Sequence, residues 1–255
     1  MCSASPPVSE DATSTASSSP GRPRYTPEKN TVPPAGGWPH MTKEYCAGFK
    51  SDYTVQVLRH LPYFEKRRDD EAAVHYKSHL IDYIAWTTED CAAGDQAVDC
   101  FEFRDDENDL VDAADVFYFA EGCQLYGRYM WLMVADGSVV EELVRSDNIL
   151  NYDVGLYFEE LKAAYRSLKL IPCFGKKTLE ADNVPEVAVD ITKEQVYAQP
   201  QDWGTDLDVQ YIRQVYRQHG WPDAFQRDEA KKAIDDLIQS MPEERDSWMW
   251  EFTFL

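Results

Sequence analysis

Positively charged residues are scarce in this sequence. Among its 255 residues, 25 are Lys or Arg and 46 are Asp or Glu, which leaves a net charge of −21 at neutral pH. A field of that sign repels phosphate backbones and anionic lipid headgroups. We therefore expect no nucleic-acid partner and no membrane partner, whereas a basic protein or a cation is electrostatically favoured.

Long hydrophobic runs and paired cysteines are also missing. No stretch approaches the about 20 apolar residues that cross a bilayer, and the Ser/Pro/Thr-rich start of the chain carries no apolar signal-peptide core. No Cys-x-x-Cys pair or zinc-ribbon spacing occurs among the six cysteines, Cys2, Cys46, Cys91, Cys100, Cys123 and Cys173. These absences predict a cytoplasmic or nuclear protein with free, mostly buried thiols.

Recognisable catalytic motifs are absent as well. The sequence contains no glycine-rich dinucleotide or P-loop pattern and no Gly-x-Ser-x-Gly nucleophile elbow. His75 and His79 could share a metal ion if both lay on one helix face. However, no general-base Glu and no diagnostic third ligand accompany them, which favours two solvent-facing histidines. We predict no catalytic residue, no cofactor and no metal.

The negative charge is concentrated in one segment, since Glu89 to Glu121 contains twelve acids and one base. The loop at 105–109 resembles a calcium loop superficially, but Leu110 and Val116 replace the Gly and Glu that an EF-hand requires. A solvated acidic loop that aids solubility is one interpretation, and an interaction surface is the other. The predicted interaction surface comprises Asp105, Asp106, Glu107 and Asp109, with Trp248 and Trp250 near the C-terminus.

Residues 1–36 are predicted to form a disordered tail. They are rich in Ser, Thr, Pro and Ala, carry no net charge, and cannot bury enough apolar surface to offset the entropy of ordering. Ser19 and Thr26 each precede a proline, in a pattern typical of substrates of proline-directed kinases. Phosphorylation at these two residues is one hypothesis, and chance occurrence in a Ser/Pro-rich tail is the other.

The most informative segment surrounds Asp136-Gly137, which is flanked by two apolar runs. Asp-Gly is typical of a two-residue type I′ turn, so the pattern predicts a β-hairpin. The first arm, residues 129–134, is apolar on both faces, which is typical of a strand inside a sheet covered on both sides.

The remaining periodicity predicts an α+β fold, with a mainly antiparallel sheet built around residues 98–144 and covered by helices. We treat 37–255 as a single domain whose C-terminal part, about 203–255, is helical. Helices are expected at 51–61, 153–169, 208–219 and 228–240, with a loose helical pattern at 71–85. Strands are expected at 98–103, 116–120 and 187–191.

The chain ends with four aromatic residues at alternate positions, from Trp248 to Phe254. Left exposed, such a strand would promote aggregation. A terminal strand docked on the sheet or under a helix is the favoured interpretation, and a docking strand for a partner is the alternative.

Short motifs give this chain a resemblance to a group of uncharacterised proteins of filamentous fungi. The motifs are Val57-Leu-Arg-His-Leu-Pro-Tyr63, Tyr157-Phe-Glu-Glu-Leu161, Leu168-Lys-Leu-Ile-Pro172 and Val215-Tyr-Arg-Gln-His-Gly-Trp-Pro222. They span about 37–225 and imply no activity. The hairpin followed by a helix is also similar to the core of the SUKH superfamily, whose members act as binding modules in fungal cell-wall signalling and bacterial toxin immunity.

These observations favour a non-enzymatic intracellular protein-interaction module with an unknown, basic protein partner. The sequence sets no oligomeric state. Two alternatives stay open. One is an enzyme whose site is assembled from scattered His and carboxylate residues. The other is a small-molecule binding protein whose pocket is lined by aromatic residues, which make up 13% of the chain.

Overall fold

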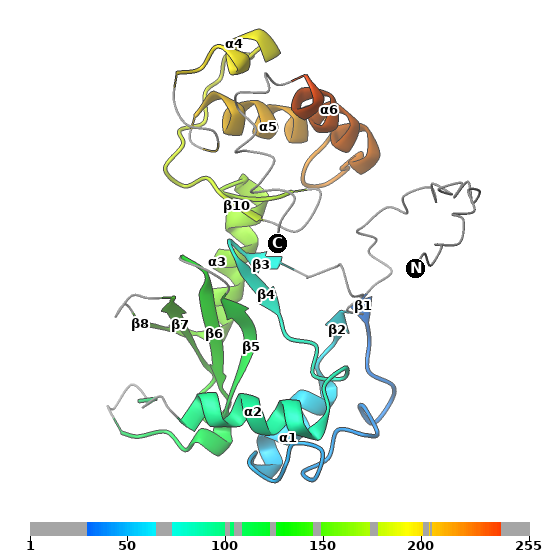
Figure 1. Cartoon of the computed structure of the whole chain (residues 1–255), viewed down its shortest axis with the longest axis vertical. Helices are drawn as coiled ribbons and strands as arrows, with labels where there is room; N and C mark the ends of the chain where they lie inside the picture. The colour runs from blue at the N-terminus through cyan, green and yellow to red at the C-terminus, as the bar shows by residue number, and fades with distance from the viewer. Residues whose placement is uncertain are drawn as a thin grey trace, which may run out of the picture.

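The computed structural model describes residues 30–64, 73–99, 103–104, 109–122, 126–144, 149–173, 178–200, 204 and 206–240. They form an α+β fold around a six-stranded antiparallel sheet, with two further two-stranded sheets, β1–β2 and β9–β10 (Figure 1). The predicted fold class is therefore confirmed. None of the helices within the described ranges is long and apolar enough to cross a membrane.

The main sheet has the strand order β3-β4-β5-β6-β7-β8, and each neighbouring pair is antiparallel. Its strands are β3 (Ala73–His75), β4 (Ser78–Leu80), β5 (Val116–Gly122), β6 (Arg128–Met133), β7 (Ser138–Leu143) and β8 (Ile149–Asp153). The small sheets pair β1 (Asn30–Thr31) with β2 (Tyr63–Phe64), and β9 (Leu170–Pro172) with β10 (Thr178–Glu180). Ordered structure thus begins before residue 37, the expected start of the domain.

The helices lie at both ends of the sheet and along one of its faces. Helices α1 and α2 lie at one end of the molecule, α5 and α6 lie at the other, and α3 runs along the sheet toward β10 (Figure 1). The helices are α1 (Asp52–His60), α2 (Thr88–Asp99), α3 (Val154–Ser167), α4 (Lys193–Tyr197), α5 (Leu207–Gln218) and α6 (Arg227–Gln239).

Strand β6 is buried on both faces, as predicted for residues 129–134. On one face Trp131 packs with Phe103, Val116 and Val140. On the other face Met130 packs with Val139 of β7 and with α3. Because no side chain of β6 is exposed, both faces of the sheet must be covered for this strand to be stable.

The Asp136-Gly137 hairpin exists, but the predicted type I′ turn is wrong. Residues 134–137 form a four-residue loop between the paired residues Met133 and Ser138. Gly137 has a positive φ of +75°, whereas Asp136 does not. The reason is local, since the Asp136 carboxylate accepts a hydrogen bond from the Ser138 N–H at 2.9 Å and so holds a different turn.

The predicted helices at 51–61, 153–169, 208–219 and 228–240 are confirmed as α1, α3, α5 and α6. Asp153 caps α3 as expected, because its carboxylate accepts the Leu156 N–H at 2.9 Å. The end of α3 differs from the prediction, since Leu168 adopts a left-handed conformation there. Pro172, which was expected to close the helix, lies instead in β9.

Three other predicted elements are wrong. Residues 73–80 form the β3–β4 hairpin and not a helix, because Lys77 turns the chain with a φ of +51°. The expected strand at 98–103 begins inside helix α2, which runs to Asp99. The expected strand at 187–191 is an irregular segment in which Val187 and Val189 alternate in sequence but are 47% and 76% exposed.

The C-terminal helices have a core of their own. Ile212, Val215 and Tyr216 of α5 pack with Ile234 of α6 and with residues of β9 and β10. Arg213 lies buried among them and donates hydrogen bonds to three backbone carbonyls, those of Leu168, Ala181 and Val184. A buried guanidinium that is bonded in this way fixes the loops around β9 and β10 against α5.

Gly220 ends α5 as predicted, with a positive φ of +84°, and a Cβ there would overlap the Ala224 carbonyl oxygen. We expect Gly220→Ala to lower the free energy of unfolding by about 3 kcal/mol or more, since steric overlap adds to the left-handed strain. Gly48→Ala is the matched control, because Gly48 also has positive φ but an added Cβ meets no atom within 4 Å. It should cost about 1 kcal/mol. Equal losses in urea denaturation would contradict this account.

Candidate functional site

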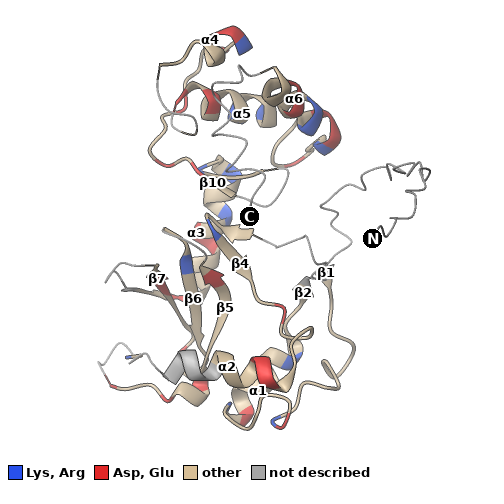
Figure 2. Cartoon of the chain, viewed as in Figure 1, with Lys and Arg blue, Asp and Glu red and all other residues tan. Residues whose placement is uncertain are grey.

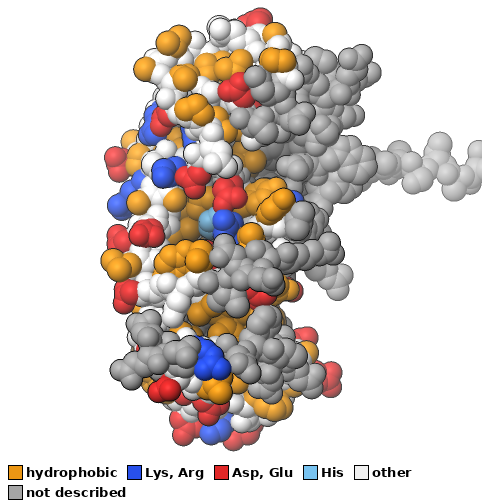
Figure 3. Space-filling model, turned by 90° about the vertical axis from the view of Figure 1, so that its left-hand side faces the viewer, with side chains coloured by type: hydrophobic (Ala, Val, Ile, Leu, Met, Phe, Trp, Pro, Cys, Tyr) orange, Lys and Arg blue, Asp and Glu red, His pale blue; other side chains and the backbone are white. Residues whose placement is uncertain are grey.

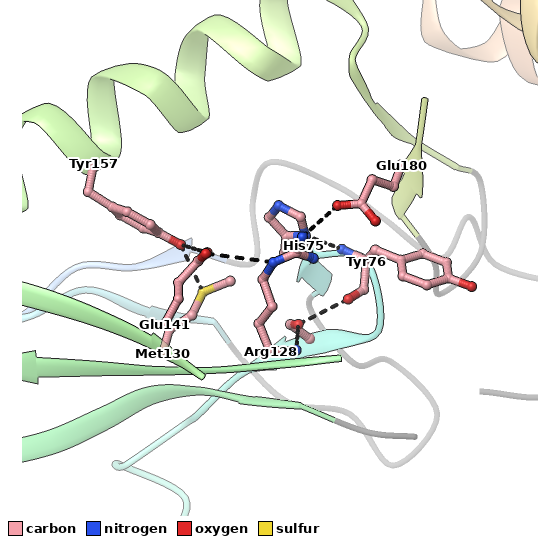
Figure 4. A network of polar contacts seen from close by, with 8 residues as sticks. His75, Tyr76, Arg128, Met130, Glu141, Tyr157 and Glu180 are labelled. Carbon is pink, nitrogen blue, oxygen red and sulfur yellow. Dashed lines mark hydrogen bonds and ion pairs between the residues drawn. The ribbon is translucent and has the colours of Figure 1, made fainter. Parts of the chain in front are cut away.

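The most extensive polar network of the sheet surrounds Arg128, the first residue of β6. Its guanidinium donates hydrogen bonds to Glu180 of β10 at 2.7 Å and to His75 Nδ1 of β3 at 2.9 Å (Figure 4). Its Nε lies 3.7 Å from a carboxylate oxygen of Glu141 in β7. One cation thereby connects three strands, and two carboxylates offset its charge.

The His75 ring is an acceptor in this network. Arg128 can only donate, and the Tyr76 backbone N–H also donates to Nδ1 at 2.8 Å, so the neutral ring carries its proton on Nε2. Burial, with a smaller contribution from the Arg128 charge, lowers the pKa of His75 to about 3. At neutral pH His75 therefore stays uncharged.

Tyr157 of α3 extends the network to the helical layer. Its hydroxyl donates to Glu141 Oε1 at 2.7 Å and lies 3.3 Å from the Met130 sulfur (Figure 4). Burial raises the pKa of Tyr157 far above its ordinary value, and the neighbouring Glu141 charge acts in the same direction. Tyr157 thus remains a hydrogen-bond donor that holds α3 on the sheet.

A second set of contacts joins the same elements. The Tyr165 hydroxyl of α3 donates to the Val74 carbonyl at 2.9 Å and lies 3.2 Å from the Thr178 hydroxyl of β10. Together with the Arg128 network, these bonds connect β3, β10 and α3. These contacts have a structural role: they attach β10 and α3 to the main sheet.

The two histidines singled out in the sequence do not form the pair that was considered. His75 and His79 lie on opposite arms of the β3–β4 hairpin, where His79 is paired with Ala73. The favoured interpretation, two solvent-facing histidines, is also wrong, because both residues are half-buried. Within the described ranges, no group of three or more His, Cys, Asp or Glu residues could hold a metal ion.

Of the predicted interaction surface, the structure describes Asp109, which is exposed. The other members lie outside the described residues, as do the two predicted phosphorylation sites: Asp105, Asp106, Glu107, Trp248, Trp250, Ser19 and Thr26. The predicted interaction surface and the two phosphorylation sites therefore stay predictions.

Sequence reasoning missed strand β8, which forms the outer edge of the main sheet. Val154 donates its N–H to the carbonyl of Gly137, the residue just before β7, at 2.9 Å. In an antiparallel ladder this orientation alternates, so the backbone groups of Leu150 and Tyr152 face β7. Those of Ile149 and Asn151 face outward, as does the Asp153 N–H, and no strand of the described structure pairs with them.

The side chains at this edge are open to solvent. Leu150, Asn151 and Asp153 are all exposed, and Leu150 remains 43% exposed. Leu156, in the first turn of α3 just beyond the strand, is 66% exposed. Figure 3 views the molecule from this side and shows hydrophobic side chains interspersed with acidic and basic ones. The β8 edge, as we call residues 149–153, thus combines unpaired backbone groups with exposed apolar atoms.

Comparison of the chain with protein-family models, with curated proteins and with solved structures finds no match. The resemblance to the fungal group and to the SUKH superfamily therefore stays a prediction.

The pKa of His75 predicts an acid-dependent loss of stability. Between about pH 6.5 and pH 3 the unfolded chain binds a proton that the folded chain excludes, so stability falls as the pH is lowered through this window. His75→Asn keeps an acceptor for Arg128 but cannot titrate. We expect this variant to lose less stability than the wild type between pH 7 and pH 4, measured by urea denaturation.

His75→Ala serves as the comparison for this experiment. It removes the acceptor itself and should lower stability at every pH. Parallel pH dependence in the wild type and His75→Asn would show that His75 does not control the acid response.

Arg128 is expected to be the most sensitive position of the network. Arg128→Gln leaves Glu141 and Glu180 partly buried without their cation, which should lower the free energy of unfolding by about 2–4 kcal/mol. The matched control is Arg166→Gln on the exposed side of α3, with an expected change within about 0.5 kcal/mol. Thermal and urea unfolding would measure both, and similar losses would contradict the assigned role of Arg128.

Proposed function

We propose that this chain is a non-enzymatic protein-interaction module that binds an extended segment of another protein along the β8 edge. The observation that carries the proposal is the row of outward backbone groups at Ile149 and Asn151, continued by the Asp153 N–H. Unpaired strand edges are templates for strand addition, in which main-chain hydrogen bonds supply affinity.

The composition of β8 supports this function. Proteins commonly protect exposed edges with lysine, proline or a bulge. Strand β8 has the sequence Ile-Leu-Asn-Tyr-Asp, which contains neither lysine nor proline, and its pairing with β7 is regular over all five residues. An edge of this kind can accept a strand without prior rearrangement.

The charge of the chain supports a protein partner over other classes. Acidic residues occur on helices at both ends of the molecule (Figure 2), and the net charge of −21 disfavours nucleic acid and anionic membrane surfaces. We place this function in the cytoplasm or nucleus, in keeping with the sparse and unpatterned cysteines.

A photo-crosslinking amino acid at position 150, in the full chain expressed in its native host, tests the proposal. We expect a discrete adduct with another protein. Asn151→Pro should abolish the adduct, because proline removes one outward N–H while the ladder to β7 stays intact. Asn151→Thr keeps the N–H and should preserve the adduct.

A crosslinker at Val189, which is 76% exposed and distant in sequence, controls for random collisions. Circular dichroism and thermal unfolding establish that both Asn151 variants are folded. An adduct that forms equally in the Asn151→Pro chain, or equally from position 189, would rule out the β8 edge as the binding site.

A further inference from the structure

We infer that the segment bound at the β8 edge is a basic strand with apolar residues at alternate positions. This inference rests on the proposed function and adds the chemistry of the partner. It follows from three properties of the edge: the direction of its backbone groups, the different character of its two faces, and its local charge.

The backbone sets the register of the partner. Since the N–H and C=O groups of Asn151 face outward, a partner residue opposite Asn151 exchanges both hydrogen bonds with it. The partner residues before and after that position then lie beside Leu150 and Tyr152. Successive side chains of the partner therefore meet opposite faces of the sheet.

The two faces at this edge differ in polarity. On the α3 face, Tyr152 packs with Tyr157 and Phe158, and Leu150 presents exposed apolar surface on the same side of the strand. The opposite face presents Asn151 and Asp153, with Glu142 on the neighbouring strand. A partner with apolar residues toward α3 and polar residues on the other side matches both faces.

The charge on the polar face selects the sign of the partner. The stretch 134–160 contains seven acids and one base, and two of these acids, Glu142 and Asp153, lie on the polar face itself. Of these two carboxylates, that of Asp153 is exposed and that of Glu142 is half-buried. Lys or Arg side chains that alternate with apolar ones would meet this negative field, and acidic side chains would be repelled.

Three labelled peptides test the inference with the full chain, by fluorescence anisotropy. The first is Lys-Val-Lys-Val-Lys-Val-Lys. The second replaces every Lys with Glu, and the third has the same composition as the first, in the order Lys-Lys-Lys-Val-Val-Val-Lys. We expect the first peptide to bind at least about tenfold more tightly than the second and about fivefold more tightly than the third. The third peptide controls for non-specific attraction, because a protein with this negative charge attracts any polycation.

Three variants locate the binding. Asn151→Pro should weaken the first peptide at least about tenfold and leave the third nearly unchanged, whereas Asn151→Thr should stay within about twofold of the wild type. Asp153→Asn preserves the cap of α3 and removes one charge, so it should weaken the first peptide about twofold to threefold and reduce its salt dependence.

The inference is overturned if the acidic and basic peptides bind alike, if the third peptide binds as tightly as the first, or if Asn151→Pro has no effect. It is also overturned if sedimentation equilibrium shows a dimer that Asn151→Pro dissociates, because a second copy would then occupy the edge. If the position-150 adduct forms and depends on Asn151 but the peptides show no preference, the docking function stands and the partner chemistry fails. If no adduct forms at position 150, both the docking function and the inferred partner chemistry are rejected.

Discussion

The burial of β6 on both faces is the constraint on which the rest of this structure depends. A strand with no exposed side chain requires a layer of structure on each of its two faces. Trp131 and its neighbours supply the contacts of one layer, and Met130 packs against α3 in the other. Deleting either layer would expose a large apolar surface, and each Å² exposed would lower the free energy of unfolding by roughly 25 cal/mol.

Arg128 shows how the same strand tolerates a charge. It is the first residue of β6 and lies near β3, β7 and β10. Two carboxylates and a neutral histidine surround its guanidinium. Strand β10 is connected to the main sheet and to α3 by side-chain hydrogen bonds, Arg128 to Glu180 and Tyr165 to Thr178. A few ionised and hydroxyl groups therefore carry much of the connection between the sheet and the C-terminal helices.

Patterns of local origin were predictable from the sequence, and long-range placement was not. The stripes on α3, α5 and α6, the Asp153 cap and the Gly220 helix end depend on neighbouring residues, and the structure confirms them. Val187 and Val189 alternate as strand residues do, yet the structure leaves them exposed, since alternation alone does not make a segment pair with a sheet. The Arg128 network was missed because its partners are distant in sequence: Glu180 lies 52 residues from Arg128. Strand β8 was missed although its partner β7 directly precedes it in the chain. For the network, the signal in the sequence was Arg128 itself, a single charged residue at the start of the apolar strand β6.

The two edges of the main sheet are not equivalent. At β3 the Val74 carbonyl already accepts the Tyr165 hydroxyl, and β10 lies alongside. At β8 the outward groups are unpaired within the described structure. A sheet with two accessible edges can propagate indefinitely, each newcomer offering a fresh template for the next. With the β3 edge obstructed, copies of this chain can join their sheets only through β8, so such joining stops at a pair and fibre growth is discouraged.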